Sequence, residues 1–104
     1  SPVCAPCTLR RRFGTPTGQT DSDHVLLVFQ GVTPSAIASL ESQTLGEIAS
    51  ESTIGFDITP FLAGNNYLQL AFKETVEPVG VCEVRIDIAD DSEIRTTSYP
   101  VINP

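Results

Sequence analysis

Short segments of alternating hydrophobic and polar residues run along this chain, and each ends at glycine, proline or a polar turn. The clearest lies at residues 24–30, where Val25, Leu27 and Phe29 share one strand face. Turn signals recur at roughly 8- to 15-residue intervals, a spacing typical of an all-β sandwich. We therefore expect about seven strands in two packed antiparallel sheets, at residues 7–13, 24–30, 35–41, 54–58, 67–72, 81–88 and 94–101.

One short helical turn is expected within this β pattern. Thr59 is suited to cap the turn, Pro60 to occupy its first position and Gly64 to end it. Alternation within the strands also predicts the core, because neighbouring side chains on a strand point to opposite faces. The expected core residues are Val25, Leu27, Phe29, Ala36, Ala38, Leu40, Leu68, Leu70, Phe72, Val84, Ile86 and Ile88.

The opposite face of the second strand is apolar as well. Leu26 and Val28 lie there, and Ile37 would lie beside them if the second and third strands pair. A loop, a neighbouring domain or a second copy of the chain would have to cover such a stripe. If exposed, Leu26, Val28 and Ile37 would form a docking surface for self-association or a protein partner.

Length and charge narrow the class of protein. A chain of 104 residues suffices for one domain, which we place at residues 1–104. The formal net charge of -7 makes nucleic acid an unfavourable partner. No apolar run approaches the roughly 20 residues of a membrane-spanning helix.

Five short motifs occur in an order and spacing that resemble a known family. They are Arg-Arg-Arg-Phe at 10–13 with Pro16, Phe-Gln-Gly-Val at 29–32, Phe-Asp-Ile-Thr at 56–59, Gly64 with Asn66 and Leu68, and Val-Arg-Ile-Asp-Ile at 84–88. Together they resemble the β-sandwich (jelly-roll) accessory domain of glycoside hydrolase family 2 enzymes, a galactose-binding-domain-like fold. The resemblance covers about residues 9–88. It implies a normally non-catalytic domain, with carbohydrate as the ligand class.

Two segments depart from the family pattern. The family usually has Trp-Leu-Asn-Gly where residues 39–42 read Ser-Leu-Glu-Ser, so the Asn-Gly hairpin signal is missing. The family loop with a Gly-Gly pair and an aromatic residue is replaced by the polar segment 47–52.

The sequence favours a binding module over an enzyme. His24 is the only histidine, and no nucleophile motif accompanies it, so a solvated histidine at a strand edge is the better interpretation. The acidic run 90–93 lacks the spacing of a known calcium loop and is better read as a solvated turn. We predict no cofactor and no metal.

Three cysteines leave several alternatives open. Cys4 and Cys7 form a Cys-x-x-Cys pair, which occurs in redox motifs, zinc sites and small disulfide loops. A Cys3His zinc site would use Cys4, Cys7, Cys82 and His24. Cys7 and Cys82 are the candidates for a disulfide, and buried free thiols are the competing interpretation. A disulfide would imply an exported protein, so an extracytoplasmic or secreted location is expected.

Aromatic residues that could stack on a sugar are few. There is no Trp, and the two tyrosines, Tyr67 and Tyr99, are both expected to point outward. The candidate ligand-binding residues are Tyr67, Tyr99, Asn65, Asn66, Gln69 and Glu41. The alternative function is a structural or protein-interaction domain that uses the apolar stripe.

Overall fold

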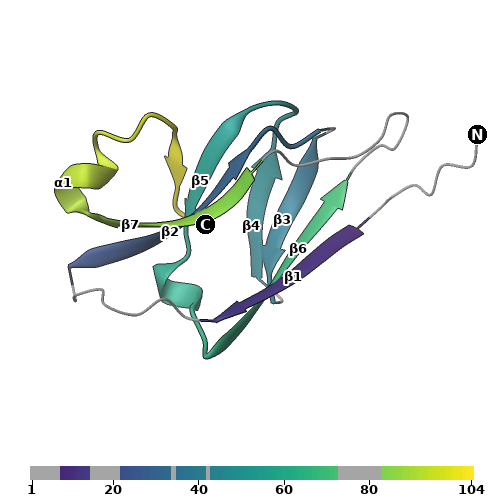
Figure 1. Cartoon of the computed structure of the whole chain (residues 1–104), viewed down its shortest axis with the longest axis horizontal. Coiled ribbons are helices and arrows are strands. Elements are labelled where there is room, and N and C mark those ends of the chain that lie inside the picture. The colour runs from purple at the N-terminus through teal and green to yellow at the C-terminus, as the bar shows by residue number, and fades with distance from the viewer. Residues whose placement is uncertain (1–7, 15–21, 34, 42, 73–82) are drawn as a thin grey trace, which may run out of the picture.

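A computed structural model describes residues 8–14, 22–33, 35–41, 43–72 and 83–104. Two four-stranded sheets face each other as a sandwich (Figure 1). The first sheet has the order β1 (Thr8–Gly14), β6 (Asn65–Phe72), β3 (Ala36–Leu40), β4 (Gln43–Ile48). The second has the order β7 (Glu83–Asp90), β2 (Asp23–Gln30), β5 (Thr53–Asp57), β8 (Val101–Ile102). The expected all-β sandwich is confirmed.

The chain passes repeatedly from one sheet to the other. β1, β3, β4 and β6 belong to the first sheet, whereas β2, β5, β7 and β8 belong to the second. Strand pairs are antiparallel apart from β5 and β8, which run parallel. The 3-10 turn η1 (Thr59–Phe61) leads from β5 towards β6 and confirms that a helical turn forms here. Its predicted ends are wrong, because Ile58 rather than Thr59 is the N-cap residue and Leu62 rather than Gly64 is the C-cap residue.

The core between the sheets is built as the alternation predicts. Val25, Leu27 and Phe29 of β2 meet the inward residues of β3 and β6, and the rings of Phe29 and Phe56 pack edge to face with centroids 6.0 Å apart. Ile88 is the exception. It is 40% exposed, so its predicted core position is wrong. Ile88 lies near the end of β7, which is an edge strand of its sheet.

The C-terminal segment differs from the prediction. Residues 94–101 do not form a strand; α1 (Asp91–Ile94) follows β7 directly, and β8 begins only at Val101. A capping box starts α1. The Asp90 carboxylate accepts a hydrogen bond from the backbone N–H of Glu93, and the Glu93 carboxylate accepts one from the backbone N–H of Asp90. The acidic run therefore encodes a helix start, not a simple turn.

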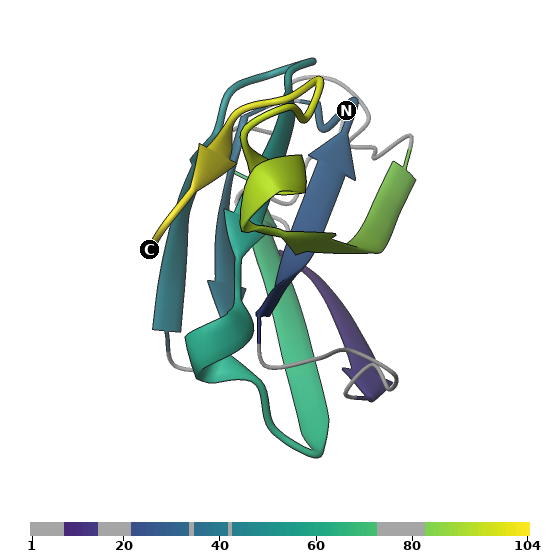
Figure 2. The ribbon, with the colours of Figure 1, turned by 90° about the vertical axis from the view of Figure 1, so that its left-hand side faces the viewer.

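This segment covers the outer face of the second sheet, where the docking stripe was expected. Leu26 and Val28 are fully buried beneath Tyr99, with Ile94 and Val101 packed alongside. Figure 2 shows α1 and the chain after it lying over β2 and β5. Ile37 lies on β3 in the other sheet and is 36% exposed. The proposed docking surface is therefore wrong, because a segment of the same chain already covers two of its three residues.

Polar contacts hold Tyr99 in this position. Its hydroxyl donates to Asp87 Oδ2 at 2.6 Å, and the Arg85 guanidinium carbon lies 5.6 Å from the ring centroid. Burial, together with the hydrogen bond to Asp87, raises the pKa of Tyr99 to about 12. Tyr99 is only 8% exposed, so the expectation that its ring points outward is wrong.

Candidate functional site

The best candidate site is a shallow depression on the outer face of the first sheet. It has a volume of about 240 Å³ and is lined by Arg10, Glu41, Tyr67, Leu68 and Gln69. Tyr67 is 50% exposed, the highest value among the large hydrophobic residues described. The depression therefore combines an accessible aromatic ring with a guanidinium, a carboxylate and an amide.

Strand register explains why these side chains meet. Arg10 pairs with Gln69 and Arg12 with Tyr67 across β1 and β6. Directly opposed residues in an antiparallel pair share a face, with Cβ atoms about 4.5–5.5 Å apart. Glu41 joins them from the end of β3, where its backbone N–H donates to the carbonyl of Tyr67 at 2.9 Å.

Glu41 adopts an unusual backbone conformation at this position. It lies in the two-residue connection between Leu40 and Gln43, which pair with each other, and its φ is +55°. Glycine and asparagine tolerate this left-handed region better than glutamate does. Glu41 stands where the family usually has Asn of the Asn-Gly turn. It places a carboxylate at the rim of the depression, at a cost in backbone strain.

The structure brings together three of the six predicted ligand-binding residues, namely Tyr67, Gln69 and Glu41. Asn65 is exposed on the same face of β6 but does not line the depression. Tyr99 packs on the opposite sheet.

Asn66 was also predicted to contact a ligand, but it is fully buried. Its side-chain oxygen accepts from the Ala63 N–H at 2.8 Å. Its amide donates to the carbonyls of Ala63 and Phe13. All of these partners are backbone groups, so Asn66 shapes the entry to β6 and its placement as a ligand-binding residue is wrong.

Sequence reasoning missed Arg10 as part of the depression. In the sequence, the Arg-Arg-Arg run stood out only as part of a motif that resembles the family. Alternation along the strand places Arg10 and Arg12 on one face. The site could have been predicted from this pattern only with knowledge that β1 pairs with β6.

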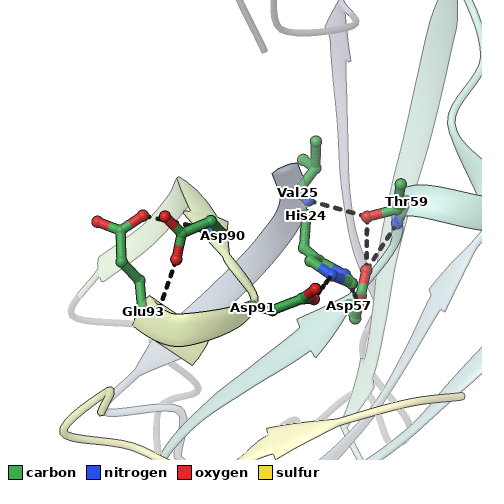
Figure 3. A network of polar contacts seen from close by, with 7 residues as sticks. All are labelled: His24, Val25, Asp57, Thr59, Asp90, Asp91 and Glu93. Atoms are coloured by element: carbon green, nitrogen blue, oxygen red, sulfur yellow. Dashed lines mark hydrogen bonds and ion pairs between the residues drawn. The ribbon is translucent and has the colours of Figure 1, made fainter. Parts of the chain in front are cut away.

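A second polar cluster surrounds His24 on the other sheet (Figure 3). Its Nδ1 lies 2.7 Å from Asp57 Oδ2, and its Nε2 lies 2.7 Å from Asp91 Oδ1. Thr59 completes the cluster, because its hydroxyl donates to Asp57 at 2.6 Å and accepts from the Val25 N–H at 2.9 Å. The cluster joins the start of β2, the end of β5 and the start of α1.

His24 and Asp57 each favour the charged form of the other. Hydrogen bonds to Asp91 and then Asp57 raise the pKa of His24 above 6.5. Burial would raise the pKa of Asp57, but hydrogen bonds from Thr59 and His24 outweigh it and hold that pKa below 3.8. The two neighbouring carboxylates therefore favour the protonated form of His24.

This arrangement argues against a chemical role for His24. A general base needs a free ring nitrogen within reach of a substrate proton, and a zinc ligand needs a free nitrogen lone pair. Both nitrogens of His24 already face carboxylates. The interpretation of His24 as a simple solvated histidine is also wrong, because it ties three elements together.

A smaller hollow lies where β1 faces β7. It measures about 120 Å³, and its lining consists of Arg11, Phe13, Leu27, Leu68, Val84, Arg85 and Ile86. Most of these residues are apolar members of the core edge or pack against it. The hollow lacks the group of polar side chains that surrounds Tyr67.

The cysteine predictions lie outside the described residues. Cys4, Cys7 and Cys82 all fall in segments that the structure does not describe. Among residues 8–14, 22–33, 35–41, 43–72 and 83–104, no group of three or more His, Cys, Asp or Glu side chains is arranged to hold a metal ion. No helix in these same ranges is both long and apolar enough to cross a membrane.

Comparison with protein-family models finds no match, and comparisons with curated proteins and with solved structures likewise find no significant match.

Proposed function

We propose that this chain is a non-catalytic binding module whose ligand is a carbohydrate, built on a galactose-binding-like jelly roll. The depression around Tyr67 carries the proposal. Sugar sites commonly pair an exposed aromatic face with a few polar groups that fix orientation. Tyr67 supplies the ring, and Gln69, Glu41 and Arg10 supply donors and acceptors within one hollow.

The size of the depression limits its occupant. Its volume of about 240 Å³ is below the roughly 300–1,000 Å³ typical of sites for drug-sized ligands. It is also open on one side of the sheet, so it buries only part of a bound molecule. One sugar residue, or one residue of a longer glycan, matches this size.

The jelly-roll assignment rests on the strand order together with the sequence resemblance. Apart from the neighbours β3 and β4, adjacent strands are not consecutive in sequence: β6 lies between β1 and β3, and β2 lies between β7 and β5. The Phe-Asp-Ile-Thr motif has an architectural role here. Phe56 and Ile58 enter the core while Asp57 binds Thr59 and His24. The Gly-x-Asn-x-Leu motif is likewise structural, through Asn66.

The non-catalytic assignment draws on the His24 cluster. The only histidine of the chain is enclosed by Asp57 and Asp91, which leaves it no free nitrogen for proton transfer. The alternative, a structural or protein-interaction domain, has lost its specific support, because the apolar stripe on β2 is buried within the chain itself.

The test is binding of the wild-type domain to an array of glycans, repeated with two variants of one residue. Tyr67→Ala removes the stacking surface and should abolish binding. Tyr67→Phe keeps the ring and should retain most of the affinity. Ile88→Ala, which truncates an exposed apolar residue on the other sheet, is the control and should bind as wild type does. No binding by the wild-type domain to any glycan would refute the proposed function.

A further inference from the structure

Two guanidinium groups flank Tyr67, and neither has an ion-pair partner among the described residues. Arg10 lines the depression, and Arg12 stands directly opposite Tyr67 in the strand register. Both are exposed.

Arg85, in contrast, is paired with carboxylates of the same chain. Its Nη1 lies 2.7 Å from Glu83, and its Nε lies 3.0 Å from Asp87. The chain has 13 acidic residues for only 6 basic ones, so carboxylates are plentiful. Even so, none of the described carboxylates pairs with Arg10 or Arg12.

The local charge is opposite in sign to that of the whole chain. Arg10 and Glu41 line the depression with one charge of each sign, and Arg12, paired with Tyr67 in the strand register, adds a second positive charge beside it in a chain of net charge -7. At physiological ionic strength the Debye length is about 8 Å. The electrostatic energy of a small anion in the depression therefore depends mainly on these nearby charges. Salt largely screens its repulsion by acidic residues farther away.

We infer that the ligand of the Tyr67 depression is an anionic sugar, such as a uronic acid. This inference rests on the proposed function and narrows its ligand class. The sugar ring lies against Tyr67, and its carboxylate binds Arg10 and Arg12, whose planar fork matches a carboxylate in two parallel hydrogen bonds. Glu41 and Gln69 accept hydrogen bonds from hydroxyl groups.

Glu41 also limits how much negative charge the site accepts. A second anionic group near Glu41 would meet like charge, and a long polyanion would extend over the acidic remainder of the chain. Short oligosaccharides with one charge at the depression should therefore bind better per sugar than long, densely charged polymers.

The decisive experiment compares an acidic oligosaccharide with its neutral twin by calorimetry. Trigalacturonate and a glucuronate-containing trisaccharide are each titrated beside their methyl esters, which keep the stereochemistry and remove the charge. The acidic forms should bind about tenfold more tightly than the esters. Raising the ionic strength from about 0.01 M to about 0.15 M should weaken only the acidic forms.

Three arginine variants complete the test. Arg10→Gln and Arg12→Gln should each weaken binding of the acidic sugar about tenfold and leave binding of the ester unchanged. Arg95→Gln removes the same charge from an exposed residue of the C-terminal segment, on the other outer face, and should change neither. Equal affinity for acid and ester would overturn the anionic ligand while leaving carbohydrate binding intact. An Arg95→Gln effect as large as that of Arg10→Gln would overturn it as well, by showing non-specific attraction.

Discussion

Tyr99 packs directly against the backbone of Gly55. A Cβ atom added to Gly55 would lie 2.7 Å from Cε1 of Tyr99, closer than non-bonded carbons approach. The Gly55 N–H also donates to the carbonyl of Pro100, so a backbone hydrogen bond holds the C-terminal segment to β5 next to this contact. Glycine at position 55 therefore allows the segment to cover the outer face of the second sheet.

Gly55→Ala should consequently destabilise the domain by about 1–3 kcal/mol, the usual cost of overpacking. The ring cannot swing away freely, because Asp87 and Arg85 hold it. Gly64→Ala is the matched control, since no atom lies within 4 Å of its added Cβ. Urea denaturation of both variants measures the difference. Equal midpoints would contradict the close packing of Tyr99 on β5.

Val28→Thr tests whether the apolar stripe of β2 is core. The substitution keeps the shape and buries a hydroxyl beneath Tyr99, which should cost about 1–3 kcal/mol. Ile37→Thr alters the third residue predicted for the stripe, which lies exposed on the other sheet, and should change stability by no more than about 0.5 kcal/mol. Thermal unfolding followed by circular dichroism measures both. If Val28→Thr were neutral and instead dissociated an oligomer, the stripe would be a docking surface after all.

Because of His24, the stability of the domain should decrease as the pH rises above about 6.5, the ordinary pKa of histidine in the unfolded chain. The pKa of His24 in the folded chain is raised above 6.5, so the protonated form is favoured by folding. That contribution is complete below the unfolded pKa and disappears as the pH rises through the folded pKa. Asp57, with its lowered pKa, stays ionised across this range.

NMR of the imidazole signals measures the pKa of His24 in the folded chain directly, since the chain has no other histidine. Their titration midpoint should lie above 6.5, and His24→Gln should flatten this part of the pH dependence of the unfolding temperature. A midpoint at or below 6.5 would contradict the bridge to Asp57 and Asp91.

Replacing either of two strained glutamates should stabilise the domain. Glu41 and Glu51 both have positive φ, at +55° and +63°. Asparagine tolerates this region better, so Glu41→Asn and Glu51→Asn should each raise stability by about 0.5–1 kcal/mol. Only Glu41→Asn should change glycan binding, because Glu51 does not line the depression. Equal effects of the two variants on binding would remove Glu41 from the site.

Local alternation predicted most of the strands but missed β4 (Gln43–Ile48), for which no strand was expected. The inward faces of β2, β3 and β6 follow from residues such as Phe29, Leu40 and Phe72, since burial on one face enforces a period of two. The strand predicted at residues 94–101 was wrong for a local reason. Asp90 and Glu93 have the spacing of a capping box, which here starts a helix.

The contacts that sequence reasoning missed join residues far apart along the chain. Tyr99 covers Val28, and Asp91 reaches His24, yet neither contact leaves a local pattern. The same holds for the depression, where Arg10 and Gln69 meet through the register of β1 and β6. Tyr67 and Gln69 were found because an exposed aromatic residue on a regular strand is visible in the alternation itself.

The most direct test of the account is an amide-shift titration of the ¹⁵N-labelled domain against a panel of acidic and neutral glycans. We predict saturable shifts for acidic sugars that centre on Tyr67, Gln69 and Glu41 and extend to Arg10 on β1. Amides around Tyr99, on the opposite face, should not move. A flat response to every sugar, or shifts confined to the Tyr99 side, would contradict the central claim that the Tyr67 depression is a carbohydrate site.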